Sequence, residues 1–506
     1  MCQAGSSLCK GRTGGIKLKF CARKPGCKAK TSIFNAMRKN RIYWMLTLTV
    51  FVSLLIPTLV QEGMFLDGIT YAAISKNMAN GYGSFFNPHY TKILYSNFHE
   101  HPPLVFILQS GFFKLFGNAF YTERIFSLLI AILTVIGITQ CWRLFNDKNE
   151  FKEYDWLPVL LWLSIPLVSW SYKNNLLENT MGVFTIFAVF FILKSFIEKR
   201  IIYLFVGGVL IVLAFLSKGP VGLFPILVPL LYAIVYKSNK NALKYSAYLI
   251  LFTISISYIF SIAFPELKQN IVLYFEQQLI PALSNKREIT TNNRFTIILN
   301  LILELSLPIA LLVYFTIREW IKTRKPDFLK DKKALIFLLI AITASIPLII
   351  SLKQRKFYLI PSIPFYVLTI SILVVPFVKR FIDAPSNSTL RWIKRASLLS
   401  LAMVLLFSAF QFGKFSRDKE KLTDVYAIST IIPEGTVIST TRDLWSDWSL
   451  VAYMCRIGYL SLDCDNEHDY YLLERNSNMD KHVLENYEIV NMNLTRYEML
   501  RRKVQK

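Results

Sequence analysis

Several features that mark common protein classes are missing from this sequence. The cysteines of the N-terminal tail, at positions 2, 9, 21 and 27, lack the paired Cys-x-x-Cys spacing of a zinc site, which disfavours metal binding there. Residues 1–41 contain eleven Lys and Arg but no acidic residue, a composition typical of a disordered cytoplasmic tail. No small-residue cleavage site closes the first apolar run, which is therefore expected to be a retained membrane anchor. Met37, shortly before that run, is an alternative start of the protein.

The sequence is instead rich in long hydrophobic segments. Hydrophobic residues make up 53% of the chain and the mean hydropathy is +0.39, above the values of soluble domains. Within residues 42–414, runs close to the roughly 20 residues that cross a bilayer core recur between short charged loops. They predict an all-α polytopic membrane protein of about eleven to thirteen spans, eleven being favoured. The eleven segments are Ile42–Val60, Glu123–Trp142, Leu157–Ser171, Met181–Ile197, Ile201–Leu216, Val221–Tyr236, Tyr245–Phe264, Thr296–Ile317, Leu335–Ser351, Tyr358–Val378 and Ala396–Phe412.

The net charge of +25 would suit a nucleic-acid partner, but its distribution predicts a membrane topology instead. Basic residues gather in alternate loops, as the positive-inside rule produces when the N-terminus is cytoplasmic in an inner-membrane protein. This pattern holds only if Leu104–Gly117, about 14 residues long, lies in the membrane plane on the outer face rather than crossing. The cations assigned to the inside are Lys237, Lys240, Lys244, Arg318, Lys322, Arg324, Lys325, Lys330, Lys332, Lys333, Lys379, Arg380, Arg391, Lys394 and Arg395.

Residues 415–506 contain no further apolar run and are predicted to form a small extracytoplasmic α/β domain. Gly435–Thr440 and Asp469–Leu473 have the composition of short strands. Outside the cytoplasm Cys455 and Cys464 could form a disulfide, and two unlinked thiols are the alternative. This domain has no internal repeat, Gly-rich phosphate loop or Ser/His/Asp constellation, so we expect the chemistry to lie in the membrane domain.

The same topology collects the unusual polar residues on the outer face. The first outer loop, residues 61–122, contains Asp67, and an acidic residue at a bilayer edge is costly to keep. Carboxylates there would face cations from later loops. This arrangement suits transfer from a lipid phosphate, because Lys or Arg neutralises the phosphate while a base removes the proton of an acceptor hydroxyl. The outer polar residues are Glu62, Asp67, Tyr71, His89, His99, Glu100, His101, Asn174, Asn175, Glu178, Lys218, Glu276, Lys286, Arg287, Arg294, Lys353, Arg355 and Lys356.

Each of these residues also has a simpler interpretation. Lys218 in the third outer loop, Ser217–Pro220, could be an interface anchor that extends along the bilayer surface, and so could Lys353, Arg355 and Lys356 in the fifth, Leu352–Tyr358. Asp67 could be a solvated carboxylate with no chemical role. His99, Glu100 and His101 could hold a divalent metal ion, but they lack helical spacing and a defined fourth ligand, so no cofactor is required.

Four motifs of the first outer loop follow one another in a recognisable order. The stretch Asp67–Met78, Asp-Gly-Ile-Thr-Tyr-Ala-Ala-Ile-Ser-Lys-Asn-Met, precedes His101-Pro-Pro-Leu104, Leu115-Phe-Gly117 and Arg124. This order resembles the protein-mannosyltransferase-like glycosyltransferases, whose bacterial branch includes the lipid A aminoarabinose transferases. Their pattern runs D-E-x-x-Y-A-x-I-A-x-x-M, then K/H-P-P-L, then L-F-G and an arginine.

Two later segments extend the resemblance to about Ile42–Val378. Ser217–Pro220 is similar to the family's T-K-G turn, and Lys356–Pro364 is similar to its K-x-x-Y-I-L-P-x-x-P segment. The resemblance implies the GT-C fold, with in-plane helices in the first outer loop. It also implies inverting transfer of a sugar from an undecaprenyl- or dolichyl-type phosphate on the outer face of the membrane, with Asp67 as the general base.

The resemblance further implies which residues contact the donor. It places Glu100 and His101 beside the donor and Lys218 near its phosphate. In the aminoarabinose transferases a lysine precedes Pro-Pro, and His101 binds phosphate well only when protonated, so much of that role would pass to Lys218 or Arg287. The family has an arginine in the fourth outer loop, which is about Pro265–Phe295 here, and Arg287 and Arg294 are the candidates for it. The donor- and substrate-binding residues predicted on this basis are His101, Lys218, Arg287, Arg294, Lys356, Tyr71 and Glu178.

Gly68 is the second departure from the family pattern. The family has an acidic residue directly after the catalytic aspartate, and this sequence has a glycine there. Help from a second carboxylate must then come from Glu62, Glu100 or Glu178.

The main alternative function is a polytopic transporter or lipid flippase. Such proteins usually place functional charges near the bilayer midplane, whereas most predicted spans lack them and Glu304 is the main exception. A lipid-carrier polymerase or ligase of another fold would share the topology but not the spacing of Asp67 and the His-Pro-Pro motif. Lipid A, another cell-envelope glycan and a protein all fit as the acceptor, and membrane lipids are the other expected partners.

Overall fold

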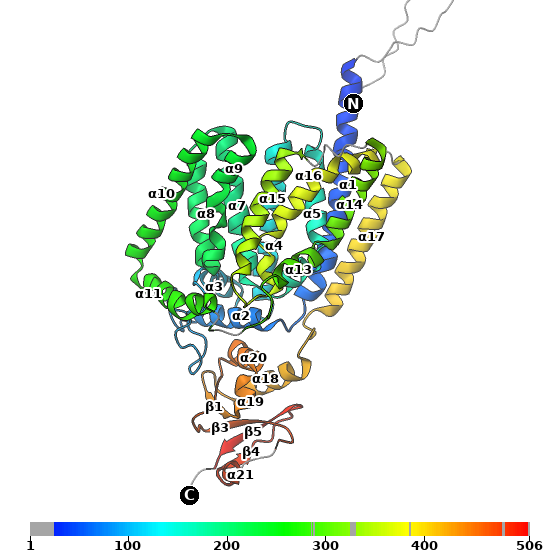
Figure 1. The fold of residues 1–506 in the computed structure, drawn as a ribbon. Helices are drawn as coiled ribbons and strands as arrows, with labels where there is room; N and C mark the ends of the chain where they lie inside the picture. Colours follow the sequence, from blue (N-terminus) through cyan, green and yellow to red (C-terminus); the bar gives the residue numbers. More distant parts are fainter. Residues whose placement is uncertain are drawn as a thin grey trace, which may run out of the picture.

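A computed structural model describes residues 25–284, 286, 289–323, 330–383, 386–477 and 481–503. It consists of a helical bundle and a small C-terminal domain at one end of that bundle (Figure 1). The first helix, α1, begins at Pro25, so part of the predicted tail is helical, and residues 1–24 lie outside the described residues.

The bundle and its ends are built from α-helices and a few shorter helical segments. The first twelve α-helices, with two other helical segments among them, are α1 (Pro25–Leu59), α2 (Leu66–Ala79), α3 (Leu104–Phe116), α4 (Thr122–Asn146), α5 (Trp156–Leu163), α6 (Pro166–Lys173), α7 (Leu177–Glu198), α8 (Ile202–Lys218), η2 (Pro220–Leu227), α9 (Val228–Tyr236), α10 (Asn239–Ala263), α11 (Pro265–Tyr274), a π-helical segment (Phe275–Leu279) and α12 (Ile280–Leu283). The others are α13 (Thr296–Glu304), α14 (Ser306–Thr323), α15 (Lys332–Ser345), η5 (Ile346–Ile349), η6 (Lys356–Leu359), α16 (Ile363–Asp383) and α17 (Asn387–Gln411).

Each of the eleven predicted spans overlaps helix in the structure. Among the described residues, 7 helices are long and apolar enough to cross a membrane, or 8 if the bent pair α13 and α14 is one span. The remaining segments are shorter, because Pro166 separates α5 from α6 and Gly219-Pro220 separates α8 from η2 and α9. The polytopic all-α membrane fold is therefore confirmed, while the number of spans stays a prediction.

The first outer loop contributes two helices, α2 and α3, at the end of the bundle that faces the C-terminal domain (Figure 1). As predicted, the apolar segment from Leu104 forms only a short helix. Helix α2 is buried along most of its length, from Gly68 to Met78, because it is enclosed between the bundle and the C-terminal domain. The loop that contains α11 and α12 lies at this same end.

The C-terminal domain is a mixed five-stranded sheet covered by helices, which confirms the predicted small α/β domain. The strand order is β2-β1-β3-β5-β4, with β1 parallel to β2 and β3, and β5 antiparallel to β3 and β4. Helices α18 and α20 lie between the sheet and the bundle (Figure 1). The elements are α18 (Lys419–Ile431), β1 (Val437–Thr440), α19 (Arg442–Ser446), α20 (Trp448–Gly458), β2 (Ser461–Asp463), β3 (Tyr470–Glu474), α21 (Lys481–Asn486), β4 (Tyr487–Ile489) and β5 (Tyr497–Arg502).

The interface between bundle and C-terminal domain belongs to the main hydrophobic core. Met64 and Ile69, at the start of α2, are in the same buried cluster as Leu422 and Tyr453 of the C-terminal domain. Cys455 also lies in this interface, and its thiol donates to the carbonyl of Tyr90 at 3.0 Å. Cys455 and Cys464 are both free thiols, so the second of the two alternatives holds in the structure.

Candidate active site

Asp67 lies in the first turn of α2, where the positive end of the helix dipole favours a carboxylate. The helix begins after Phe65, whose backbone N–H donates to Oδ1 of Asn174 at 2.7 Å. Tyr71 follows one turn later on the same face, since residues four apart lie above each other on a helix. Its hydroxyl oxygen is 3.1 Å from Nε2 of His101, and the two rings meet edge to face. The structure thus brings the His-Pro-Pro motif to the face of α2 that carries Asp67.

Gly68 lies where α2 approaches the connection between α6 and α7 most closely. Nδ2 of Asn175 donates to the Gly68 carbonyl at 3.2 Å, and Nε2 of Gln109 donates to Oδ1 of Asn175 at 2.7 Å. A Cβ atom at position 68 would collide with the backbone carbonyl of Asn174. The acidic residue of the family pattern therefore does not fit here without a shift of backbone, which gives the glycine a physical reason.

Arg124 holds the backbone on both sides of this contact. Its guanidinium donates to the carbonyl of Gly63, before α2, at 2.6 Å, and to the carbonyl of Lys173, at the end of α6. The side chain is buried. Arg124 thereby joins the two segments that flank Asp67, which accounts for an arginine at the end of the first-loop motif.

A cavity of about 210 Å³ opens at this end of the bundle, between the N-terminus of α7 and the C-terminus of α8. Four of the predicted site residues line it, namely Glu100, His101, Glu178 and Lys218. The other lining residues come from η2, from the loop with α11 and α12, and from the fifth outer loop. They are Met181, Pro220, Val221, Tyr274, Gln278, Leu279, Ala282, Leu283, Pro347, Leu348, Ile350, Ser351, Lys353 and Tyr358.

Lys218 and Glu178 form a buried ion pair on the cavity wall. Helix α8 ends at Lys218 because Gly219 has a φ of +86° and Pro220 cannot continue the helix. The ammonium group also lies 4.9 Å from the ring centre of Tyr358, within range of a cation–π contact. The second carboxylate oxygen of Glu178 is buried and has no hydrogen-bond partner among the residues that the structure describes.

The electrostatic surroundings of Asp67 combine burial with nearby cations. Burial raises the pKa of Asp67 above the ordinary value of an aspartate, while the positive charges of Lys218, Arg355 and Lys353 act in the opposite direction. Glu100 adds a smaller upward contribution. The balance leaves a carboxylate that binds a proton more readily than an exposed one, which suits a general base.

The fifth outer loop distributes its three cations differently. Lys353 lines the cavity, and Arg355 acts on Asp67 through its charge. Lys356, which was predicted to bind substrate, is largely exposed and lies 3.8 Å from the carboxylate of Glu304. The sequence did not indicate which of these three residues is directed toward α2, because a short loop allows any of them to point that way.

The two arginines predicted in the fourth outer loop are not on the described wall of the cavity. Nη1 of Arg294 donates to the carbonyl of Ile350 at 2.8 Å. Arg287 lies outside the described residues. Their roles in donor binding stay predictions.

The proposed metal ligands are directed toward other partners. Tyr95 donates to Oε1 of Glu100 at 3.1 Å, and Nδ1 of His99 is 2.9 Å from the carbonyl of Asn97. Within the described part of the chain, no three His, Cys, Asp or Glu side chains lie together as a metal site would require.

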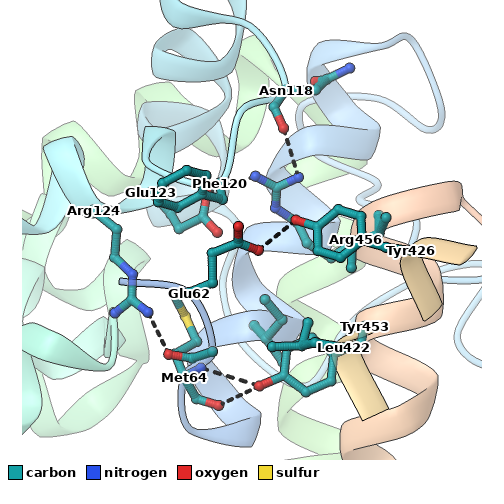
Figure 2. Close-up of a pocket in the computed structure, with 13 residues that line it drawn as sticks. Glu62, Met64, Asn118, Phe120, Glu123, Arg124, Leu422, Tyr426, Tyr453 and Arg456 are labelled. Carbon is teal, nitrogen blue, oxygen red and sulfur yellow. Dashed lines mark hydrogen bonds and ion pairs between the residues drawn. The ribbon is translucent and has the colours of Figure 1, made fainter. Parts of the chain in front are cut away.

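A second cavity, of about 150 Å³, lies between the bundle and the C-terminal domain (Figure 2). Glu62 extends into it and accepts a hydrogen bond of 2.6 Å from the hydroxyl of Tyr426. Burial raises the pKa of Glu62. Ile69 of α2 lines this cavity, and Ile69 lies on the face of α2 away from Asp67. The second cavity is therefore separate from the candidate active site, and Glu62 is on the wrong side of α2 to act beside Asp67.

The comparisons with known proteins agree with this architecture. The family model for dolichyl-phosphate-mannose-protein mannosyltransferase matches residues 100–262. The crystal structure of ArnT from Cupriavidus metallidurans bound to undecaprenyl phosphate superposes with a TM-score of 0.63 at 16% sequence identity, over 90% of this chain and 97% of that chain. The chain has the GT-C fold. The apo structure of the same ArnT gives a TM-score of 0.60, over 94% of this chain and 98% of that one, again at 16% identity.

The family model matches only part of the chain, so only part of the GT-C resemblance is supported by a sequence match. Residues 100–262 include Glu100, His101, Arg124, Glu178 and Lys218, and the family match confirms the predicted resemblance. Asp67 and the C-terminal domain lie outside this segment. The fold comparison covers 90% of the chain. No curated protein matches the chain by sequence.

Proposed function

We propose that this protein is an integral-membrane glycosyltransferase that moves a sugar from a polyprenyl-phosphate donor to an acceptor hydroxyl with inversion. The observation that supports it best is the placement of one partly buried carboxylate, Asp67, beside a cavity lined by Lys218 and Lys353 at one end of the bundle. A base and several cations together are what transfer from a lipid phosphate needs. The family match and the shared fold support the same class of reaction.

In the proposed reaction Asp67 accepts the proton of the acceptor hydroxyl as its oxygen attacks the anomeric carbon. The bond from that carbon to the phosphate oxygen breaks, and the polyprenyl phosphate leaves with the electron pair. Lys218 and Lys353 offset the negative charge that grows on the phosphate. An ammonium group has three N–H donors, so Lys218 keeps donors for the phosphate while it is held by Glu178.

Tyr71 and His101 would orient the donor at the rim of the cavity. Burial keeps the pKa of Tyr71 well above 10, so its hydroxyl stays protonated and can donate to Nε2 of His101. His101 is then available to the sugar or its phosphate through the rest of the ring. Lipid A, a surface glycan and a protein remain the candidate acceptors, and the outer face of the inner membrane remains the proposed site of transfer.

The transporter alternative receives less support from the charges inside the bundle. Glu304, the main charge predicted within a span, accepts a hydrogen bond of 3.1 Å from the backbone of Leu167 and pairs with Lys356 of the fifth outer loop. A carboxylate held in this way caps α6 and pairs with a loop, which differs from the ion sites of broken-helix transporters.

Replacing Asp67 with Asn tests the proposal. We expect transfer to fall by several orders of magnitude while the protein stays folded in the membrane, because the amide cannot accept the proton. Burial disfavours the charged form of Asp67, so the neutral variant should be at least as stable as the wild type at pH 7. Mass spectrometry of envelope glycolipids and glycoproteins, with and without the protein, would name the product. Near-full activity of Asp67→Asn would exclude Asp67 as the base.

A further inference from the structure

Helix α2 presents two opposite faces to two different partners. Asp67 and Tyr71 lie on the face toward the active-site cavity, while Ile69 and Lys76 lie about 180° to 200° around the helix, at about 100° per residue. Helix α20 of the C-terminal domain packs against α2. The catalytic carboxylate is thus carried by a helix whose other face rests on the C-terminal domain.

Lys76 forms the central polar contact between these helices. Its side chain is 3% exposed, and its ammonium group donates to the carbonyls of Arg456 and Ile457, each at 3.0 Å. These carbonyls belong to the last turn of α20, where no intrahelical donor is available and the helix dipole is negative. No carboxylate among the described residues forms an ion pair with Lys76, so the hydrogen-bond partners of its buried ammonium group are the carbonyls at the end of α20.

Further contacts attach both ends of α2 to the same helix. At the start of α2, the hydroxyl of Tyr453 lies 3.2 Å from both the backbone nitrogen and the carbonyl oxygen of Met64. At its end, Nδ2 of Asn77 donates to the carbonyl of Tyr90 at 2.6 Å and lies 3.4 Å from the sulfur of Cys455. Helix α20 therefore contacts the segment just before α2 through Tyr453 and the C-terminal half of α2 through Lys76 and Asn77.

Helix α20 is itself fixed to the bundle without the help of α2. The guanidinium of Arg456 pairs with Glu123 at 2.8 Å and donates to the carbonyl of Ala119. It also donates to the carbonyl of Asn118 (Figure 2). Both charged side chains are buried. Arg456 thus anchors α20 to the start of α4 through its side chain and receives Lys76 through its carbonyl.

We propose that the C-terminal domain positions the catalytic helix, with Lys76 as the positioning residue that sets the place of Asp67 relative to the cavity cations. This inference rests on the proposed role of Asp67. Lys76 touches neither the cavity nor any group proposed to react. A displacement of α2 by about 1 Å would be enough to lower the rate by about 100-fold.

The test compares Lys76→Met with Lys92→Met in the full-length protein. Nζ of Lys92 also donates to a carbonyl of the C-terminal domain, that of Gly435 at 2.5 Å, but Lys92 lies on the loop after α2 and is exposed at that contact. Lys76→Met loses two hydrogen bonds from a lysine ammonium to the C-terminal domain and Lys92→Met loses one, and both variants keep a side chain of similar length. Only Lys76→Met frees α2.

We expect Lys76→Met to lower kcat by about 100-fold with the KM for the polyprenyl-phosphate sugar within about threefold of the wild type. Lys92→Met should keep both constants. Hydrogen exchange of the α2 amides, residues 66–79, should accelerate at least tenfold in Lys76→Met and stay unchanged in Lys92→Met. If Lys76→Met does not fold, Tyr453→Phe, which removes one hydroxyl at Met64, should show the same pattern at smaller amplitude.

Wild-type kcat in Lys76→Met, or an equal loss in both lysine variants, would overturn the inference. Unchanged exchange in α2 would overturn it as well, and that measurement does not depend on any enzyme activity. Failure of the proposed function would appear elsewhere, as retained transfer in Asp67→Asn.

Discussion

Gly68 offers a sharp test of the active-site geometry, because the family pattern that the first outer loop resembles has an acidic residue at this point. A methyl group added at position 68 would meet the backbone of Asn174 at a distance that real Cβ atoms do not adopt. Backbone atoms cannot rotate away as a flexible side chain can. Gly68→Ala must therefore push α2 and the α6–α7 connection apart.

The size of the effect follows from two opposing terms. Overpacking of this kind costs about 1–3 kcal/mol. Alanine favours a helix over glycine by about 1 kcal/mol, so the net loss of stability should be about 0–2 kcal/mol. The rate should suffer more than the stability, since a shift of about 1 Å at Asp67 can lower kcat by about 100-fold. Gly68→Glu, which restores the family residue, should be worse than Gly68→Ala rather than better.

Gly111→Ala is the matched control. Gly111 lies within α3, and no heavy atom lies within 4 Å of the Cβ that alanine would add, so this variant should gain up to about 1 kcal/mol and keep its activity. Thermal unfolding in a membrane mimetic and initial rates of sugar transfer measure the two effects separately. The reasoning would be refuted if Gly68→Ala matched the wild type in both, or if Gly68→Glu were the more active enzyme.

Two further predictions concern the cavity. Lys218→Met leaves the buried carboxylate of Glu178 without its partner and should cost about 3–5 kcal/mol, whereas Lys218→Met with Glu178→Gln should unfold near the wild-type temperature yet transfer no sugar. Recovery of transfer in that double variant would exclude Lys218 from catalysis. The acid limb of the pH–rate profile should lie above the pKa of about 3.9 of a free aspartate, because burial raises the pKa of Asp67. Removing the cation in Lys353→Met should move the limb to higher pH, and a limb that stays in place would show that Lys353 does not act on Asp67.

The arrangement of the helices could be predicted largely from apolar length and loop charge. All eleven predicted segments overlap helix, and the short segment from Leu104 is a short helix at the expected end of the bundle. Those features are local, since a run of apolar side chains requires a helix wherever it enters a bilayer. The break between α8 and η2 falls at the predicted turn Ser217–Pro220, whereas the break at Pro166 lies inside the predicted span Leu157–Ser171 and was not predicted.

The site itself was only partly predictable. The motifs indicated Lys218 and Glu178, yet the ion pair between them joins the ends of two different helices and has no signature in spacing. The choice among Lys353, Arg355 and Lys356 depends on the path of one loop. Glu62 was a candidate second carboxylate, and the structure directs it to the C-terminal domain instead.

The support of α2 by the C-terminal domain was missed altogether. Lys76 looked like an ordinary polar position in the first-loop motif, and its partners lie 380 and 381 residues further along the chain. Nothing local marks such a contact. The one available signal was the lysine itself, at a position where the family pattern specifies no residue.

This separation along the chain has a consequence for biosynthesis. The ribosome completes α2 early, but the last turn of α20, which contains the acceptors of Lys76, follows 380 and 381 residues later in the chain. Until then Lys76 lacks its acceptors, and Asp67 lacks the support inferred above. A nascent chain that is already inserted in the membrane but still lacks α20, or a chain truncated before residue 456, would therefore contain every motif of the first outer loop and still be inactive. Activity would begin only after α20 has been synthesised and has packed against α2.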